Sequence, residues 1–360
     1  MPRHHYIPIS VLRTFASRDA WKVVAVPIEI KRRIASSDRN YIEHGQPRNW
    51  PVVIYDKREK RFTRSTIGRT CSAPQLYKVP DYDDQLIRGI VRLNLREDID
   101  EDLRGFNFEA LMKLGVEPLD SEWIERTAIG NLDRDFGRLL PLLRDAQPIS
   151  SEQIAIVLRF VAFARFRIPL WRRRYFSERH SGLVRSLKEQ IDHISQIVKN
   201  DLPEEFRESL VRLNRDMDEH VYHMAMMRYA SNGFDALSAM VKPRVKVLHT
   251  LPSVPFVTCD NPARPHKPTQ LRKIFDRGLP GIGDPRVHML YPISPLDCIV
   301  ISSDRSWRDF VHQDVTVSSV KAINTALAIM ADEQIIFSSP NTSVFEHWMK
   351  LDRLRPLLRP

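Results

Sequence analysis

The feature that most constrains the fold is a change in hydrophobic periodicity that occurs twice along the 360 residues. Short apolar runs punctuated by prolines occupy residues 1–80 and 244–360, whereas residues 83–241 carry apolar side chains at helical spacing. Strands on both sides of a helical block indicate an α+β fold. We therefore expect a single large α+β domain over residues 1–360, in which both chain ends form a small mixed or antiparallel sheet around a central helical lobe at 83–241.

The predicted elements are mostly short. Extended, largely apolar segments predict strands at 21–30, 50–56, 70–78, 245–249, 255–259, 287–291, 298–302 and 334–338. Helical spacing predicts helices at 121–143, 154–176, 182–199, 203–240, 317–331 and 343–354. Ser150 or Ser151 is the expected N-cap of the second helix, and Pro169 is expected to kink or break it.

The composition excludes a fully disordered chain, and the charge balance makes the protein basic. Charged residues make up 28% of the sequence, and the 42% hydrophobic content suffices for a packed core. A total of 55 Lys and Arg against 45 Asp and Glu gives a net charge of +10. This surplus bears on solubility and association, so its distribution along the chain is more informative than its size.

The cysteines and the lack of a long apolar stretch bear on location. Cys71, Cys259 and Cys298 are odd in number and widely spaced, which excludes a disulfide framework and suits a reducing cytoplasm. No stretch approaches the roughly 18 apolar residues of a membrane helix. The first residues lack the apolar core of a secretory signal. We expect a cytoplasmic protein without membrane contact.

Arginines are concentrated inside the helical block. Eight arginines and a single acid, Glu178, lie between residues 159 and 185. Guanidinium groups hold phosphates in a bidentate manner and stack on bases, so this segment predicts a nucleic-acid-binding surface. The alternative is a solvated basic helix end in an arginine-rich chain. The candidate binding residues here are Arg165, Arg167, Arg172, Arg173 and Arg174.

Arg167 stands out from this cluster because its helical neighbours Phe160, Phe163 and Trp171 are apolar. A buried guanidinium requires a partner, since an unpaired buried charge costs several kcal/mol. That partner is either a protein carboxylate of structural character, or a substrate phosphate or catalytic carboxylate.

Two adjacent histidines lie almost at the chain start. In a strand, His4 and His5 point to opposite faces, which disfavours a simple chelating pair. In a turn, either imidazole could act as general acid or base near neutral pH, and Tyr6 could stack on a base. The alternative is an ordered terminus with a surface pair.

The segment PFVTCDNP combines an apolar strand with a polar end. Asp260 and Asn261 follow the strand and precede Pro262. At a strand end, Asp260 could activate a water molecule or stabilise a positive transition state, and Asn261 could orient a polar group of the substrate. The alternative is an Asx turn in which both side chains bond their own backbone.

A third constellation could bind a metal. Asp216, His220 and His223 share one helix face at spacings of four and three, and one carboxylate with two histidines can hold zinc, iron or manganese. The alternative is a local His–Asp hydrogen bond on an exposed helix. The sequence contains no HExxH, GxGxxG, GxSxG or Walker motif, and we expect no cofactor.

Five segments in order resemble a known bacterial family. They are HHYIPxxxLRxF from His4, RxP from Arg167, His-Met from His223, PFVTCDNP from Pro255, and YPISP from Tyr291. Together they resemble domain of unknown function 4238 over nearly the whole chain. The resemblance implies that His4, His5, Arg167, His223, Asp260 and Asn261 share one site. It supplies no activity, although members in mobile or defence-related neighbourhoods favour nucleic-acid chemistry.

The chain departs from that family pattern at polar positions. Ile9 and Ala164 stand where glutamine is frequent, and Ile168 replaces a frequent threonine. Such losses imply an altered or enlarged pocket, or a substrate different from the usual one.

These residues favour a hydrolase acting on nucleic acid. Cleavage of an N-glycosidic bond needs one carboxylate, such as Asp260, and a histidine that protonates the leaving base, whereas two-metal nucleases need several carboxylates. A DNA glycosylase-type enzyme that excises a modified base in anti-phage defence is therefore the leading hypothesis, with the base flipped into a pocket. The alternatives are a nuclease or phosphodiesterase, and a non-enzymatic protein that binds nucleic acid.

Overall fold

The structure is a computed structural model. It describes residues 3–5, 7–16, 51–59, 61–74, 129–164, 242–263, 265–266 and 286–338, and the single positions 85, 89, 167, 208, 211, 212 and 215.

The chain divides into two compact units. The first comprises residues 1–4, 74–132 and 169–236, and the second comprises residues 5–73, 133–168 and 237–360. Both larger sheets described below lie in the second unit. The single domain with a helical lobe at 83–241 stays a prediction, and residues 133–168 of that span belong to the second unit.

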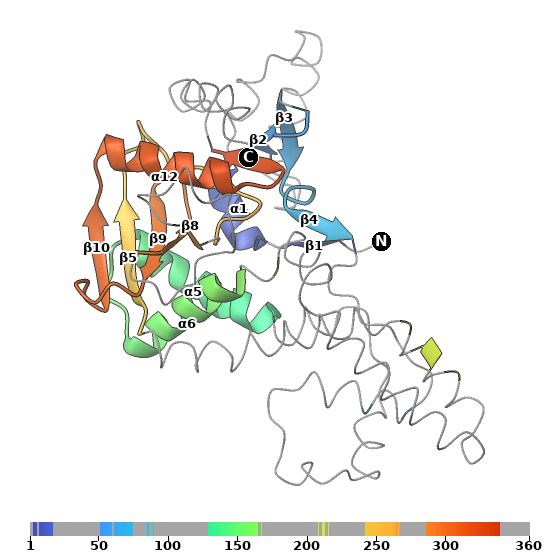
Figure 1. Cartoon of the computed structure of the whole chain (residues 1–360), viewed down its shortest axis with the longest axis horizontal. Helices are drawn as coiled ribbons and strands as arrows, with labels where there is room; N and C mark the ends of the chain where they lie inside the picture. Colours follow the sequence, from blue (N-terminus) through green and yellow to red (C-terminus); the bar gives the residue numbers. More distant parts are fainter. Residues whose placement is uncertain are drawn as a thin grey trace. The chain divides into compact units, whose positions relative to one another are not determined.

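A five-stranded mixed sheet is the centre of the second unit (Figure 1). Its strand order is β10-β5-β9-β8-β7, with β10 parallel to β5 and every other pair antiparallel. The strands are β10 (Phe310–Asp314), β5 (Arg244–His249), β9 (Asp297–Ser302), β8 (His288–Pro292) and β7 (Pro265–His266).

A second sheet joins the two ends of the chain. Its order is β3-β2-β11-β6, and all its pairs are antiparallel. The strands are β3 (Arg61–Thr66), β2 (Pro51–Asp56), β11 (Gln334–Phe337) and β6 (Thr258–Cys259). The expected α+β class, with both chain ends in a sheet, is therefore confirmed. Strands β1 (Arg3–His5) and β4 (Ser72–Pro74) form a separate pair.

The described helices longer than one turn are α1 (Ile9–Phe15), α5 (Gly130–Arg144), α6 (Ser151–Ala164) and α12 (Val317–Met330). Ser150 caps α6 as expected, since its Oγ accepts the Gln153 N–H at 3.2 Å while Gln153 Oε1 accepts the Ser150 N–H at 2.8 Å. Thr316 caps α12 by accepting the Ser319 N–H at 3.3 Å. No helix among the described ranges is long and apolar enough to cross a membrane.

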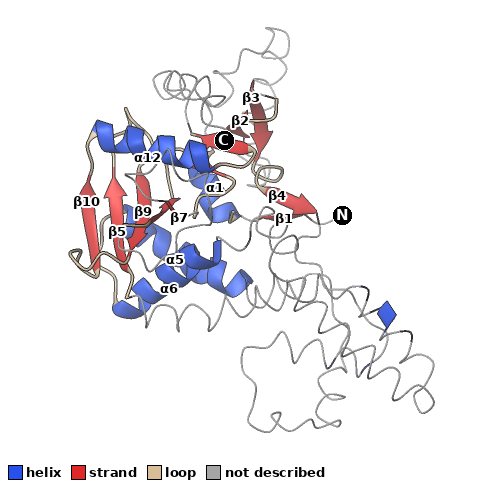
Figure 2. Cartoon of the chain, viewed as in Figure 1, coloured by secondary structure: helices blue, strands red, loops and turns tan. Residues whose placement is uncertain are grey.

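The five-stranded sheet is covered by helices on its faces (Figure 2). Side chains along a strand alternate between faces, so neighbouring residues of β8 serve different layers. Leu290 belongs to the core shared with α12 residues Val320 and Leu327. Tyr291 instead meets the Phe160 ring of α6 edge-on at 5.4 Å, and Phe160 stacks on Phe136 of α5.

Most predicted elements inside the described ranges are confirmed. The strands predicted at 50–56, 245–249, 287–291, 298–302 and 334–338 agree to within one residue at each end with β2, β5, β8, β9 and β11. The helix predicted at 317–331 is α12. The predicted strand 21–30 and the predicted helices 182–199 and 343–354 lie outside the described residues.

Two expectations need correction. The extended reading of residues 1–80 was wrong at α1, where Val11, Leu12 and Phe15 have helical spacing and are fully buried. The predicted strand 255–259 is reduced to β6. This is because the Phe256 N–H bonds the Pro295 carbonyl at 2.7 Å and the Val257 N–H bonds Asn324 Oδ1 at 2.9 Å, rather than a neighbouring strand.

Candidate functional site

Segments distant in sequence meet at the end of β8. Thr14 Oγ1 of α1 donates to the Ile293 carbonyl at 2.8 Å. The Phe256 N–H donates to the Pro295 carbonyl at 2.7 Å. Tyr291 lies within electrostatic range of Arg167. The YPISP segment is therefore the meeting point of three other segments that the sequence analysis grouped together.

Arg167 has a carboxylate partner, which resolves the question that its apolar neighbours raised. Its Nη1 and Nη2 donate to Asp133 Oδ1 and Oδ2 at 2.6 and 3.0 Å, so the pair is bidentate. Arg167 is 1% exposed, while a quarter of the Asp133 side chain reaches solvent. The guanidinium carbon also lies 5.8 Å from the centre of the Phe163 ring.

Asp133 was missed by the sequence analysis. Its helical neighbours Leu132 and Phe136 are buried, so this acid borders the apolar stripe of α5. A signal for this pair was present in the sequence. An acid borders the apolar stripe of one helix, and an arginine lies among apolar residues after the next helix, which together predict a buried ion pair.

Tyr291 places a phenol in the same region. Its side chain is fully buried, and its hydroxyl has no hydrogen-bond partner among the described residues. Burial strongly raises the pKa of Tyr291, and the nearby Arg167 opposes this rise. At neutral pH the hydroxyl therefore keeps its proton and can act as a hydrogen-bond donor.

Asp260 is 5% exposed, and three backbone amides occupy its carboxylate. Its Oδ1 accepts the Asp332 N–H at 2.8 Å, and its Oδ2 accepts those of Glu333 and Gln334 at 2.6 and 3.0 Å. Burial and the charge of Asp332 raise the pKa of Asp260 to about 7, against the opposing effect of the three amides. Asp260 thus ties its loop to the turn that leads into β11, and a catalytic role for it stays a prediction.

Asn261 is held by this anchor. It is 2% exposed, and its Oδ1 has no hydrogen-bond partner in the described parts of the chain. Its backbone N–H bonds the buried Cys259 sulfur. Because Asp260 and the Asn261 N–H are both held, the backbone that leads to this side chain is fixed and its amide oxygen is a preorganised acceptor.

Cys71 borders the same site with an unusual backbone conformation. Its φ is 49°, in the left-handed region that non-glycine residues rarely adopt. Its N–H bonds Gln334 Oε1 at 3.5 Å, and its thiol is within electrostatic range of Tyr291. All three cysteines, Cys71, Cys259 and Cys298, are buried free thiols.

The structure describes the remaining predicted site residues only in part. The backbones of His4 and His5 lie in β1, which pairs with β4 just after Cys71. The residues outside the described parts of the chain are Tyr6, Arg165, Arg172, Arg173, Arg174, Asp216, His220 and His223. Their roles stay predictions, including the metal alternative. Within the described ranges, no three His, Cys, Asp or Glu side chains could hold a metal ion together.

A row of hydrogen-bonded polar side chains crosses neighbouring strands of the five-stranded sheet, and the sequence analysis did not predict it. His249 Nδ1 lies 2.8 Å from Asp297 Oδ1, His249 Nε2 lies 2.8 Å from His312 Nδ1, and His312 Nε2 lies 3.2 Å from the Gln147 carbonyl. The donor and acceptor roles in these contacts depend on the tautomer of each ring. Burial and the neighbouring His249 lower the pKa of His312.

The fold is of the α+β class, and α1, Arg167 and the segment that precedes Asp260 come together at the end of β8. The chain belongs to the family of proteins of unknown function DUF4238, whose sequence profile matches residues 3–341. No curated protein and no solved structure matches the chain.

Proposed function

We propose that this protein is a nucleic-acid-acting hydrolase of the DNA glycosylase type, which excises a modified base from DNA in prokaryotic defence. The observation that carries the proposal is the pair of buried polar atoms, Tyr291 Oη and Asn261 Oδ1, that lack partners among the described residues. Leaving such groups unpaired costs about 1–3 kcal/mol each. A planar base edge, with donors and acceptors, is the kind of ligand that would pair with a buried donor such as Tyr291 or a buried acceptor such as Asn261.

The two groups have complementary hydrogen-bonding abilities. The Tyr291 hydroxyl can donate to a ring nitrogen or carbonyl of a base, while Asn261 Oδ1 can accept from an exocyclic amine. The aromatic ring of Phe160 beside Tyr291 contributes an apolar wall. Neutral, preorganised groups of this kind recognise a base without requiring a charged ligand.

The reaction needs a carboxylate, and geometry favours Asp133 over Asp260. In N-glycosidic hydrolysis the bond between C1′ and the base nitrogen breaks, and its electron pair leaves with the base. Water adds to C1′ and gives up one proton, and the base receives one. A carboxylate stabilises the positive sugar and takes the proton from water. Asp133 is a quarter exposed and oriented by Arg167, whereas three amides surround the carboxylate of Asp260.

Two further features support a protein that associates with nucleic acid in a reducing cytoplasm. The net charge of +10 favours association with a polyanion, which arginines 159–185 would strengthen. Three buried free thiols suit a reducing cytoplasm.

The test uses plasmid, bacterial genomic and modified-base phage DNA, each incubated with the full-length protein and analysed with and without alkali. Breaks that appear only after alkali indicate abasic sites and support the proposal. Tyr291→Phe removes one hydrogen bond to the base and is expected to lower the rate by about tenfold, because the loss of about 1–1.5 kcal/mol corresponds to that factor. Tyr55→Phe removes a hydroxyl from another buried tyrosine, in β2, and should retain activity.

Other outcomes overturn the proposal. Direct breaks without alkali would make the protein a nuclease. Intact DNA in every sample would exclude a glycosylase acting on these substrates. Equal activity of Tyr291→Phe and wild type would remove Tyr291 from the site.

A further inference from the structure

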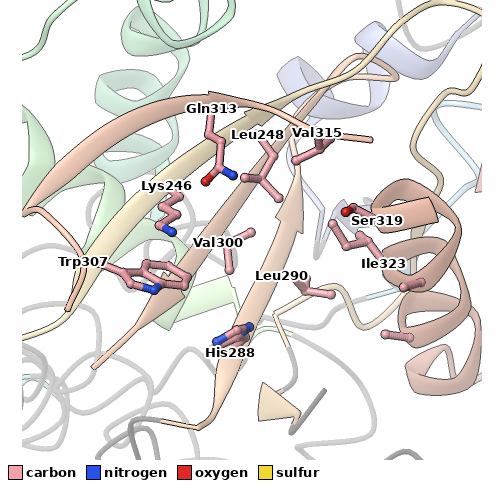
Figure 3. Close-up of a pocket in the computed structure, with 12 residues that line it drawn as sticks. Lys246, Leu248, His288, Leu290, Val300, Trp307, Gln313, Val315, Ser319 and Ile323 are labelled. Carbon is pink, nitrogen blue, oxygen red and sulfur yellow. The ribbon is translucent and has the colours of Figure 1, made fainter. Parts of the chain in front are cut away.

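A pocket of about 260 Å³ lies between the five-stranded sheet and α12 (Figure 3). It uses side chains on the α12 face of the sheet, whereas Tyr291 packs against α6. A volume of this size is slightly below the usual range of small-molecule sites and suits a compact ligand.

The floor of the pocket is an aliphatic row across three strands. The strand register aligns Lys246 of β5 with Val300 of β9, and Val300 with Leu290 of β8. Leu248 is two residues along β5, on the same face as Lys246. The floor therefore offers apolar contacts to the body of a ligand.

The opposite wall consists of small side chains on α12. Ser319, Ala322 and Ala326 lie at spacings of three and four and share one helix face with Ile323. Larger residues at these positions would fill the space between helix and sheet. The wall thus keeps the pocket open along the helix.

One end of the pocket carries a cation and an indole. Lys246 Nζ lies 3.8 Å from the centre of the Trp307 ring, and the His288 ring lies 5.2 Å from that indole. Figure 3 shows these three side chains together at one end, with Val300 and Leu290 between them and Ile323. A cation–π contact holds the ammonium in place without engaging it in a hydrogen bond to oxygen.

The loop that presents Trp307 is fixed by its own turn. Asp304 Oδ1 accepts the Ser306 N–H at 2.9 Å, and the Trp307 N–H donates to the Asp304 carbonyl at 3.2 Å. Asp304 lies within electrostatic range of Lys246 and His288. Its Oδ1 accepts its own loop amide and its charge acts on Lys246 only through electrostatic range, so a ligand anion can approach the ammonium.

We infer that this pocket binds a small organic carboxylate with a flat or branched apolar body. The body lies on Val300 and Leu290 beneath Ile323, and the carboxylate pairs with the Lys246 ammonium next to Trp307. The floor that contacts the body of the ligand is aliphatic, so it suits an apolar ring better than the polar edges of a nucleobase. The site goes beyond the proposed function, and its test does not depend on it.

The test is calorimetric titration of the full-length protein with 1-naphthoate, and with its neutral amide as a matched ligand. We expect 1-naphthoate to bind with a Kd below about 1 mM, and the amide to bind at least ten times more weakly. Lys246→Met should weaken 1-naphthoate at least tenfold without affecting the amide. Lys321→Met makes the same change at an exposed position of α12 and should leave both affinities unchanged.

A second variant tests the space itself. Ala322 is exposed at the edge of the pocket, so Ala322→Trp should fold and abolish binding of both ligands. Absence of 1-naphthoate binding at 5 mM would overturn the inference. The same holds if 1-naphthoate binds Lys246→Met and Ala322→Trp as it binds wild type, because binding would then occur elsewhere.

Discussion

The two faces of the five-stranded sheet use the same strands for different purposes. On the α6 side, Tyr291 lies near a bidentate ion pair between Arg167 and Asp133. On the α12 side, the next residue, Leu290, forms part of a cavity floor with Val300. One face encloses polar groups almost completely, and the other leaves space between small and aliphatic side chains.

This difference separates two ways of making a binding site. A buried polar group is costly unless it is paired. The face with Tyr291 therefore offers a ligand unsatisfied hydrogen-bonding groups, and the strength of binding depends on where those groups lie. The residues that line an apolar cavity lack packing contacts, and a ligand that fills the empty volume supplies them. Breaking a paired polar group on the first face should therefore strongly lower stability, whereas substitutions on the second face should mainly affect ligand affinity.

The largest effect is expected at the ion pair. Arg167→Met leaves Asp133 without its partner and should lower the free energy of unfolding by about 3–5 kcal/mol, measured by urea denaturation. Replacing both residues, as Arg167→Met with Asp133→Leu, should recover most of that loss. Lys246→Met on the cavity face should change stability by less than about 1 kcal/mol. Equal losses for Arg167→Met and Lys246→Met would remove the contrast between the faces.

The next effect is expected at Asp260, which anchors the loop 260–262 to the residues before β11. Asp260→Asn replaces one of two oxygens that accept backbone amides by a nitrogen that cannot accept, and should cost about 2–4 kcal/mol at pH 5. The exposed Asp314→Asn is the matched control and should stay within about 0.5 kcal/mol. A loss below 1 kcal/mol at Asp260 would show that the three amide contacts contribute little.

The pH dependence of the stability lost in Asp260→Asn tests the raised pKa of Asp260. The folded-state pKa of Asp260, about 7, is above its usual value of 3.8. Between these values the folded protein holds a proton that the unfolded chain has released, so raising the pH disfavours the fold. The stability advantage of wild type over Asp260→Asn should therefore shrink as the pH rises from 4 to 7 in parallel urea titrations. A constant difference would contradict the raised pKa.

Tyr291→Phe separates stability from activity on the polar face. Because the hydroxyl has no partner among the described residues, removing it should leave the free energy of unfolding unchanged or raise it by up to about 1 kcal/mol. Thermal unfolding of Tyr291→Phe beside wild type measures this. A clear loss of stability would reveal a hydrogen bond that the described residues do not contain.

The smallest effect is expected at the cavity, from His288. Burial lowers the pKa of His288, so its imidazole is largely neutral at pH 7. Protonation adds a positive charge beside Lys246, partly offset by Asp304, and should favour a bound anion. The affinity for 1-naphthoate should therefore rise by about threefold as His288 gains its proton below pH 6.5, and His288→Gln should flatten this change in calorimetric titrations. An identical pH profile in His288→Gln would assign the effect to another group.

Local patterns predicted many of the described elements but not which residues meet. The apolar runs of β5, β8 and β9 were recognisable because a buried strand needs little beyond its own side chains. Strand β3, with the sequence RFTRST, carries no such signal, and its conformation comes from pairing with β2. Helix α1 was missed because seven residues of helical spacing fall within a region that otherwise reads as extended.

The sequence by itself determined the α+β class, the cap at Ser150 and the need of Arg167 for a partner, because each depends on residues close together in the chain. Only the tertiary structure decided that this partner is Asp133, and that three amides surround the Asp260 carboxylate. It also decided that a cavity faces α12. These contacts join segments separated by tens to hundreds of residues, and their energies depend on packing and burial that no local pattern specifies.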